Sequence, residues 1–177
     1  KIGQNAADTA ELSLDDVRVP ATNLLGELNK GFIHLMQELA QERFIIAIGA
    51  ASTMEAMLAE TVRYTRERKL FGQSVFDFQN SKFKLAELKA KATAMRIMVD
   101  YYLAEHLRRK LTVEEAAIAK LFTTETMCAG LDDMLQLHGG YGYMTEYPIA
   151  RAYVNARVSR IYGGTSEVMK ELISRGL

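Results

Sequence analysis

The segment LAELKAKATAMRIMVDYY, residues 85–102, decides the fold class. Its apolar positions recur at steps of 3, 4, 3, 4 and 3, which places them in one stripe along a helix, as at the seam of a helical bundle. They are Leu85, Leu88, Ala92, Met95, Val99 and Tyr102. We therefore predict a long helix over residues 78–109.

The same spacing returns further along the chain, at Ala117, Leu121, Thr124, Cys128, Leu131 and Leu135. Thr112, followed three residues later by Glu115, has the sequence of a capping box and marks the start of this second long helix. The pair Gly139-Gly140 marks its end.

Other helices are predicted on either side of these two. Residues 31–40 indicate a short helix, and 42–68 a long one that begins almost wholly apolar (FIIAIGAA, 44–51) and is stopped by Gly72. Pro148 suits the first turn of a short helix to about residue 157, and a final helix follows Gly163-Gly164 with Thr165 or Ser166 as N-cap. The fold class is all-α, an up-and-down bundle of three or four long helices with short helices at its end.

A short β segment is predicted before the bundle. Residues 10–14 and 17–19 alternate apolar and polar side chains, and Pro20 stops them. Because two strands alone do not form an independent sheet, we expect their partner strands to lie upstream of residue 1.

Composition narrows the class of partner. The 177 residues carry 22 basic and 22 acidic side chains, and this zero net charge argues against nucleic acid and anionic membranes. The apolar run 44–51 is far shorter than the ~20 residues that span a bilayer, so no membrane span is expected. The single cysteine, Cys128, cannot form an intramolecular disulfide, which favours a reducing compartment, and we expect it to be a small core residue.

Few residues point to chemistry by themselves. His34, His106 and His138 are isolated from one another, so no metal site is predicted. The pairs Gly139-Gly140 and Gly163-Gly164 would let a phosphate or an oxyanion approach the backbone closely, although from spacing alone ordinary helix-ending and helix-starting turns are the favoured explanation.

One carboxylate stands out. Glu42 lies at the head of the most apolar segment, where burial would favour its protonated form and suit it to proton abstraction. The alternative is a surface carboxylate that pairs with a neighbouring cation.

Four motifs, taken in order and spacing, resemble the acyl-CoA dehydrogenase family. They are RERKLFGQ (66–73), FQ (78–79), QLHGGYGY (136–143) and IYGGTSE (161–167). The resemblance covers the whole chain: residues 1–27 resemble the end of the family's middle β-domain, and 28–177 its C-terminal helical domain.

The resemblance implies a cofactor site for FAD. In the family, subunits pair so that this domain holds the ADP portion of the FAD seated on its neighbour, which implies a homodimer or homotetramer. Thr165 and Glu167 would lie near the flavin, and the residues implied at the ADP side are Arg68, Phe71, Gln79, Gln136, Leu137, His138, Gly139 and Gly140.

The resemblance also implies where the catalytic base lies. Many members carry a glutamate directly after the tyrosine of the last motif, where this chain has Gly163. A subset, including the long-chain and isovaleryl enzymes, supplies the base from the helix that here holds Gln41-Glu42-Arg43, and the long-chain type is most similar.

The implied reaction is α,β-desaturation of fatty or branched acyl-CoA thioesters to trans-2-enoyl-CoA. Glu42 would remove the α-proton while the β-hydrogen leaves as hydride to the flavin, with the N–H of Gly163 polarising the thioester carbonyl. Tyr162 and Gly164 would lie beside the substrate. Arg43 would position substrate or base, or else be an ordinary surface cation.

Electrons would pass to an electron-transfer flavoprotein, in the bacterial cytoplasm or the mitochondrial matrix. Two alternatives remain open, an acyl-CoA oxidase-like enzyme and a non-catalytic helical oligomerisation domain. The chain alone is expected to be an inactive helical bundle that binds FAD weakly or not at all.

Overall fold

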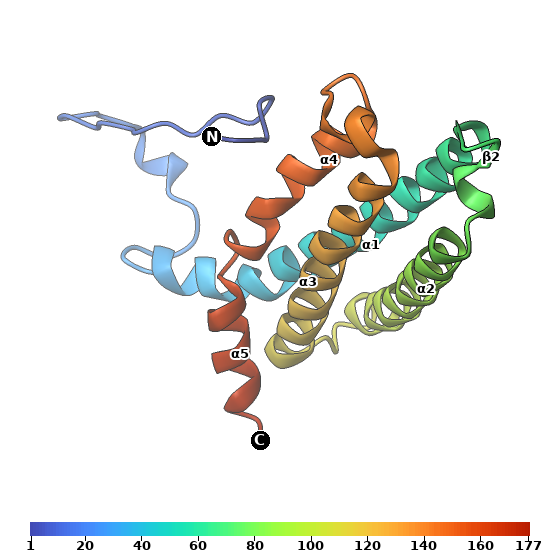
Figure 1. Cartoon of the computed structure of the whole chain (residues 1–177). Helices are drawn as coiled ribbons and strands as arrows, with labels where there is room; N and C mark the ends of the chain where they lie inside the picture. The colour runs from blue at the N-terminus through green and yellow to red at the C-terminus, as the bar shows by residue number, and fades with distance from the viewer.

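The computed structural model describes all residues 1–177, and its longest element is helix α1 (Gly31–Glu67, 37 residues). The sequence predicted a break near residue 41, which is wrong, since α1 runs through without interruption. The residues around that point, Ala40-Gln41-Glu42, are good helix formers with no glycine or proline among them. At 1.5 Å per residue, α1 is about 55 Å long and crosses the whole bundle (Figure 1).

Helices α2 (Gln79–Leu107) and α3 (Val113–His138) run back and forth beside α1 (Figure 1). The predicted stripe of α2 is confirmed, because Leu85, Leu88 and Met95 are buried in the same core as Leu131 of α3. The all-α bundle is therefore confirmed, with three long helices. Its core also takes residues from α1: Phe44, Ala47, Ala50, Ala51, Met54 and Leu58.

The ends of α3 follow the sequence signals. Thr112 Oγ1 accepts from the backbone N–H of Glu115 at 3.1 Å, while the Glu115 carboxylate accepts from the N–H of Thr112 at 2.9 Å, so the capping box is confirmed. Gly139 ends the helix with φ at +58°. A 3-10 turn, η3 (Gly139–Tyr143), follows directly.

Two short helices close the chain. Helix α4 (Pro148–Ala156) begins at Pro148 as predicted and continues into a 3-10 turn, η4 (Arg157–Arg160). Helix α5 (Ser166–Ser174) has Thr165 as its N-cap, with Thr165 Oγ1 accepting from the N–H of Val168 at 3.3 Å. Both short helices lie against α3 (Figure 1).

The sequence missed a small hairpin between α1 and α2. Strand β1 (Lys69–Leu70) pairs antiparallel with β2 (Gln73–Ser74), and a 3-10 turn, η2 (Val75–Asp77), leads into α2. The two turn residues, Phe71 and Gly72, have φ of +51° and +84°, the sign that a two-residue type I′ turn requires at both positions. Gly72 therefore serves the hairpin turn, and α1 already ends at Glu67.

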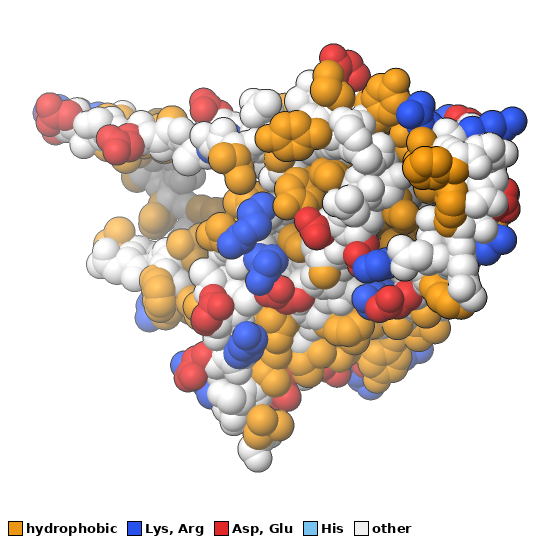
Figure 2. Space-filling model, viewed as in Figure 1, with side chains coloured by type: hydrophobic (Ala, Val, Ile, Leu, Met, Phe, Trp, Pro, Cys, Tyr) orange, Lys and Arg blue, Asp and Glu red, His pale blue; other side chains and the backbone are white.

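Residues 1–30 form an arm that stands off the bundle (Figures 1 and 2). Apart from a 3-10 turn, η1 (Ala21–Asn23), they have no regular structure, so the strands predicted at 10–14 and 17–19 are wrong for this chain. The reason is that no partner strand lies alongside, and their apolar side chains are exposed. The arm is tied to α4 near its start, where the N–H of Gln4 donates to Asn155 Oδ1 at 2.6 Å.

The length and composition of α1 alone would let it cross a membrane, a test that core helices of soluble proteins also pass. In this fold Ala47, Ala51 and Met54 of α1 are fully buried within the bundle core.

Candidate functional site

Two groups of predicted residues gather at different places on the bundle. One surrounds the loop between η4 and α5, and its backbone explains why glycine is found there. Gly163 and Gly164 have φ of +62° and +102°, values that side-chain-bearing residues rarely adopt. A Cβ on Gly163 would also lie 2.6 Å from Ile46 Cδ1 of α1. The position therefore admits no side chain unless Ile46 moves.

Two buried cations hold this loop by its carbonyl oxygens. Arg43 Nε of α1 donates to the Gly163 carbonyl at 3.1 Å, and Lys120 Nζ of α3 donates to the Gly164 carbonyl. Arg43 is 6% exposed and Lys120 is 1% exposed. The interpretation of Arg43 as a surface cation is therefore wrong. Burial lowers the pKa of the Arg43 guanidinium, and the neighbouring Glu42 carboxylate partly offsets this.

Lys120 was missed, although the sequence carried a signal for it. It lies three residues after Ala117 and four before Thr124, on the apolar stripe of α3, where a lysine requires a specific partner.

The loop is anchored again where α5 begins. Ser166 Oγ donates to Glu125 Oε1 of α3 at 2.6 Å, and the same carboxylate pairs with Arg160 at 2.8 Å. Glu167 lies in the first turn of α5, where its own backbone N–H and then the Thr165 hydroxyl lower the pKa of its carboxyl. The loop from 163 to 166 is thus fixed from both α1 and α3.

Glu42 lies on α1 next to these groups, but it is not buried. Its side chain is exposed in this chain, whereas the sequence predicted a buried carboxylate. The adjacent residue, Arg43, takes the inward direction instead, since successive helix positions point about 100° apart. Burial lowers the pKa of both Arg43 and Lys120, and the Glu42 carboxylate partly offsets this lowering at each of them.

The backbone N–H of Gly163 donates no hydrogen bond within the chain. Tyr162, the residue before it, is half-exposed, and its partial burial raises the pKa of the phenol. The site therefore offers a free N–H, a nearby carboxylate and an aromatic side chain, with two buried positive charges behind them. This arrangement suits a carbonyl that gains negative charge while a proton is removed beside it.

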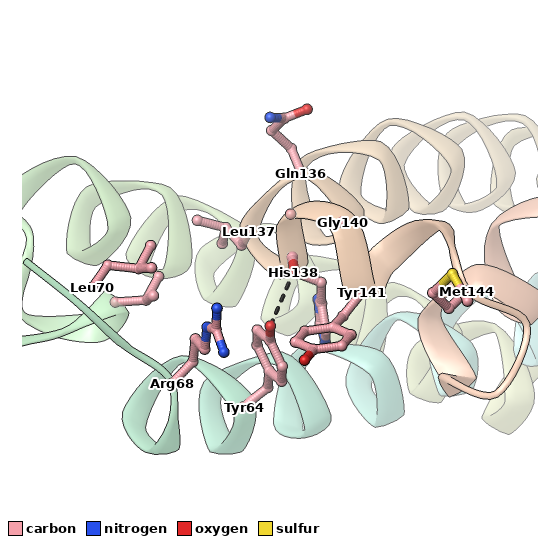
Figure 3. Close-up of a pocket in the computed structure, with 11 residues that line it drawn as sticks. Tyr64, Arg68, Leu70, Gln136, Leu137, His138, Gly140, Tyr141 and Met144 are labelled. Atoms are coloured by element: carbon pink, nitrogen blue, oxygen red, sulfur yellow. Dashed lines mark hydrogen bonds between the residues drawn. The ribbon is translucent and has the colours of Figure 1, made fainter.

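The second group lines a cavity of about 610 Å³ at the other end of α3 (Figure 3). Tyr64 of α1 stacks on the His138 ring with centroids 4.2 Å apart, and its hydroxyl donates to the His138 carbonyl at 3.1 Å. His138 Nδ1 lies 2.8 Å from the Met134 carbonyl, and Nε2 is buried without a partner. Burial lowers the pKa of the His138 imidazole.

The cavity is also lined by a cation, Arg68, and by the backbone of two glycines, Gly139 and Gly140. The Arg68 guanidinium lies 5.4 Å from the centre of the Tyr141 ring. A Cβ placed on Gly139 or Gly140 would meet nothing within 4 Å, so the backbone there is open to close approach. A cationic side chain, open backbone and aromatic rings together suit an anionic ligand with a planar group.

Most of the residues predicted for the ADP portion of the cofactor come together here, and two of them lie outside the lining. Arg68 and the run from Gln136 to Gly140 line the cavity. Phe71 stands at the hairpin turn with 96% of its side chain exposed, and Gln79 is exposed at the start of α2. Tyr64 and Tyr141 were missed, because their part depends on α1 packing against the end of α3.

Comparison with known proteins identifies the family. The family model described as acyl-CoA dehydrogenase, C-terminal domain, matches residues 29–177, so this chain belongs to the acyl-CoA dehydrogenase family. The mitochondrial long-chain specific acyl-CoA dehydrogenase of Sus scrofa is 54% identical over 175 residues, covering 99% of this chain and 41% of that protein.

Solved structures agree with this assignment. The acyl-CoA dehydrogenase of Geobacillus kaustophilus superimposes with a TM-score of 0.95 at 46% identity, over 99% of this chain and 46% of that one. Butyryl-CoA dehydrogenase of Megasphaera elsdenii gives a TM-score of 0.85 at 37% identity, over 91% of this chain and 42% of that one. The chain thus spans less than half the length of these relatives.

Proposed function

We propose that this chain is the C-terminal domain of an FAD-dependent acyl-CoA dehydrogenase that desaturates long-chain acyl-CoA thioesters between Cα and Cβ. One observation carries the proposal. Position 163 is a glycine whose carbonyl is held by buried Arg43, and the residue before Arg43 in sequence is a carboxylate, Glu42. The name of the porcine relative, 54% identical, supports the long-chain class.

In this proposal Glu42 takes the α-proton and becomes the neutral acid. The free N–H of Gly163 donates to the thioester carbonyl, so the negative charge that develops on that oxygen is stabilised as the α C–H bond breaks. Arg43 holds the Gly163 carbonyl, which belongs to the peptide that follows this N–H, and Tyr162 packs beside the thioester. Bound FAD supplies the acceptor for the β-hydrogen, which leaves as hydride and completes the double bond. Substrate and the rest of the subunit would cover Glu42, which is exposed in this chain alone.

The cavity at the end of α3 fits the ADP portion of FAD. Arg68 offers a cation for the pyrophosphate, and Gly139-Gly140 lets phosphate oxygens approach the backbone closely. Phe71 and Gln79 would extend the contact at the bundle edge. Thr165 and Glu167, near the other site, would face the flavin.

Because the two sites lie apart on the bundle, we propose that the cavity serves the FAD of a neighbouring subunit, in a homodimer or homotetramer. Residues 1–27 then belong to the preceding β-domain, whose strands would pair with 10–14 and 17–19. We place the enzyme in the bacterial cytoplasm or the mitochondrial matrix, with an electron-transfer flavoprotein as acceptor.

The test is anaerobic flavin reduction by acyl-CoA in the full-length subunit that carries this domain. Glu42→Gln should bind FAD normally and lose the rate by about 10⁴-fold or more, since it removes the base while keeping the shape. The matched control is Glu38→Gln, an exposed carboxylate one turn earlier on α1, which should bleach the flavin at the wild-type rate.

Each outcome has a separate meaning. If Glu42→Gln bleaches as fast as the wild type, Glu42 is not the base. If no acyl-CoA bleaches the wild type, the proposed reaction itself is wrong and a non-catalytic domain is favoured. Reoxidation of the reduced flavin by oxygen, and not by an electron-transfer flavoprotein, would favour an oxidase.

A further inference from the structure

We propose that Lys120 is a positioning residue for this reaction, which fixes the Gly163–Gly164 loop by its hydrogen bond to the Gly164 carbonyl. The inference rests on the proposed function for its consequence in catalysis. The bracing of the loop is a property of this chain and can be measured separately.

The first observation is the unusual environment of Lys120. Its side chain is 1% exposed, and it forms no ion pair with any carboxylate. Its ammonium instead donates to one backbone carbonyl, that of Gly164. Burial, and then the nearby Arg43 cation, lower the pKa of the amine, with Glu42 acting in the opposite direction. A lysine in such a place costs stability compared with an apolar side chain of similar volume, so packing does not explain it.

The second observation is that Lys120 and Arg43 act on successive carbonyls. Arg43 reaches Gly163 from α1, and Lys120 reaches Gly164 from α3. Both glycines have positive φ and no side chain, so their peptide planes are intrinsically free to rotate. Each peptide is planar, so fixing a carbonyl also fixes the N–H of the next residue. The two cations therefore set the backbone on both sides of Gly164.

This bracing limits how far the free N–H of Gly163 can move relative to Glu42, because that N–H belongs to the peptide before Gly163, which is joined directly to the first of the two peptides that the cations hold. Gly163 is tied to α1 by its own carbonyl, and the loop beyond it is tied to α3 by Lys120 and, through Ser166, by Glu125. Without Lys120 the Gly164 carbonyl loses its hydrogen bond to α3, while the N-cap of α5 at Thr165 is unchanged. We expect the N–H to shift or fluctuate by a distance that matters for the reaction, since misplacement by about 1 Å costs about 100-fold.

The test is Lys120→Met in the full-length subunit, with two readouts. The first is amide hydrogen exchange of peptides covering residues 161–168, which should accelerate by about tenfold when a charge-assisted hydrogen bond is removed. The second is anaerobic flavin reduction, where kcat should fall by about 10- to 100-fold while KM changes by less than about threefold. FAD content should be unchanged, and Tm should not fall, because methionine keeps the volume and removes a buried charge.

The matched control is Lys84→Met. Lys84 lies on α2, pairs with Asp133 of α3 at 2.5 Å and is partly exposed, so it joins two helices without touching the loop. This variant should change neither the exchange of residues 161–168 nor kcat.

The outcomes separate the inference from the proposed function. Unchanged exchange of the loop in Lys120→Met overturns the inference whatever the rate does, and so does faster exchange with a wild-type kcat. A rate that falls only in proportion to lost FAD or lost fold shows a merely structural role and also overturns it. If the wild type reduces no flavin with any acyl-CoA, the proposed function fails and takes the catalytic part of the inference with it, while exchange alone decides the bracing.

Discussion

Substituting alanine for Gly163 and for Gly49 should have opposite effects on stability, although the chemical change is the same. Gly163 has φ of +62°, where a side-chain-bearing residue costs about 1–2 kcal/mol. Its new Cβ would lie 2.6 Å from Ile46 Cδ1. That atom ends a side chain that can rotate, so the contact adds about 0.5–1 kcal/mol. We expect Gly163→Ala to lower the free energy of unfolding by about 2 kcal/mol.

Gly49 is the matched control, because it lies inside α1 and a Cβ there meets nothing within 4 Å. Alanine is favoured over glycine in a helix interior by about 0.5–1 kcal/mol, so Gly49→Ala should stabilise the chain by that amount. The assay is urea unfolding of the chain followed by circular dichroism, with the slope against urea unchanged in both variants.

A double-mutant cycle separates the two terms at Gly163. Ile46→Val removes Cδ1, so Gly163→Ala should cost about 0.5–1 kcal/mol less in that background, and the backbone term should remain. If the free energy of unfolding of Gly163→Ala lies within about 0.5 kcal/mol of the wild-type value, the loop tolerates a side chain at residue 163, and the reasoning from its positive φ is refuted.

Three further predictions use other parts of the fold. Thr112→Ala removes the capping box of α3 and should lower the free energy of unfolding by about 1 kcal/mol in the same urea assay; an unchanged midpoint would show that the cap contributes nothing. Burial lowers the pKa of His138 below its usual 6.5, so as the pH falls the unfolded state binds a proton at this residue before the folded state does. The free energy of unfolding should therefore decline as the pH falls below about 6.5. In urea unfolding between about pH 5 and 7.5, the free energy of unfolding should decline less steeply for His138→Gln than for the wild type. An equally steep decline in both would show that His138 is not the group responsible. Phe71→Asn places a residue that tolerates positive φ in the hairpin turn and should stabilise the chain by about 0.5–1 kcal/mol. The full-length subunit with this change should retain less FAD. Unchanged FAD retention would show that Phe71 does not contact the cofactor.

The sequence predicted those parts of the fold that depend on neighbours within one helix. The stripe through Leu85, Leu88 and Met95 is buried as predicted, and the Thr112 cap and the Gly139 end of α3 lie where local chemistry places them. It failed at the hairpin of residues 69–74, because four strand residues give too short an alternation to recognise. It also failed at residues 10–14 and 17–19, where strands need partners that this chain does not supply.

The candidate sites divide in the same way. Motifs in the sequence indicated Arg68, the run 136–140 and the glycine pair at 163–164, because each motif is continuous along the chain. Their surroundings were not visible, since Tyr64 stacks on a histidine 74 residues away and Lys120 reaches a carbonyl 44 residues away. The burial of Arg43 and the exposure of Glu42 were likewise undecided, because adjacent helix positions differ only in which one faces the bundle.

The sequence by itself thus determined helices α2 to α5, the capping box of α3 and the family, because periodicity, capping and motif spacing act over a few residues. Only the tertiary structure decided that α1 and α3 direct one buried cation each at successive carbonyls of the same loop. The hydrogen bond from Arg43 to Gly163 joins residues 120 positions apart. Contacts at that separation depend on how the helices pack, and no local pattern specifies them.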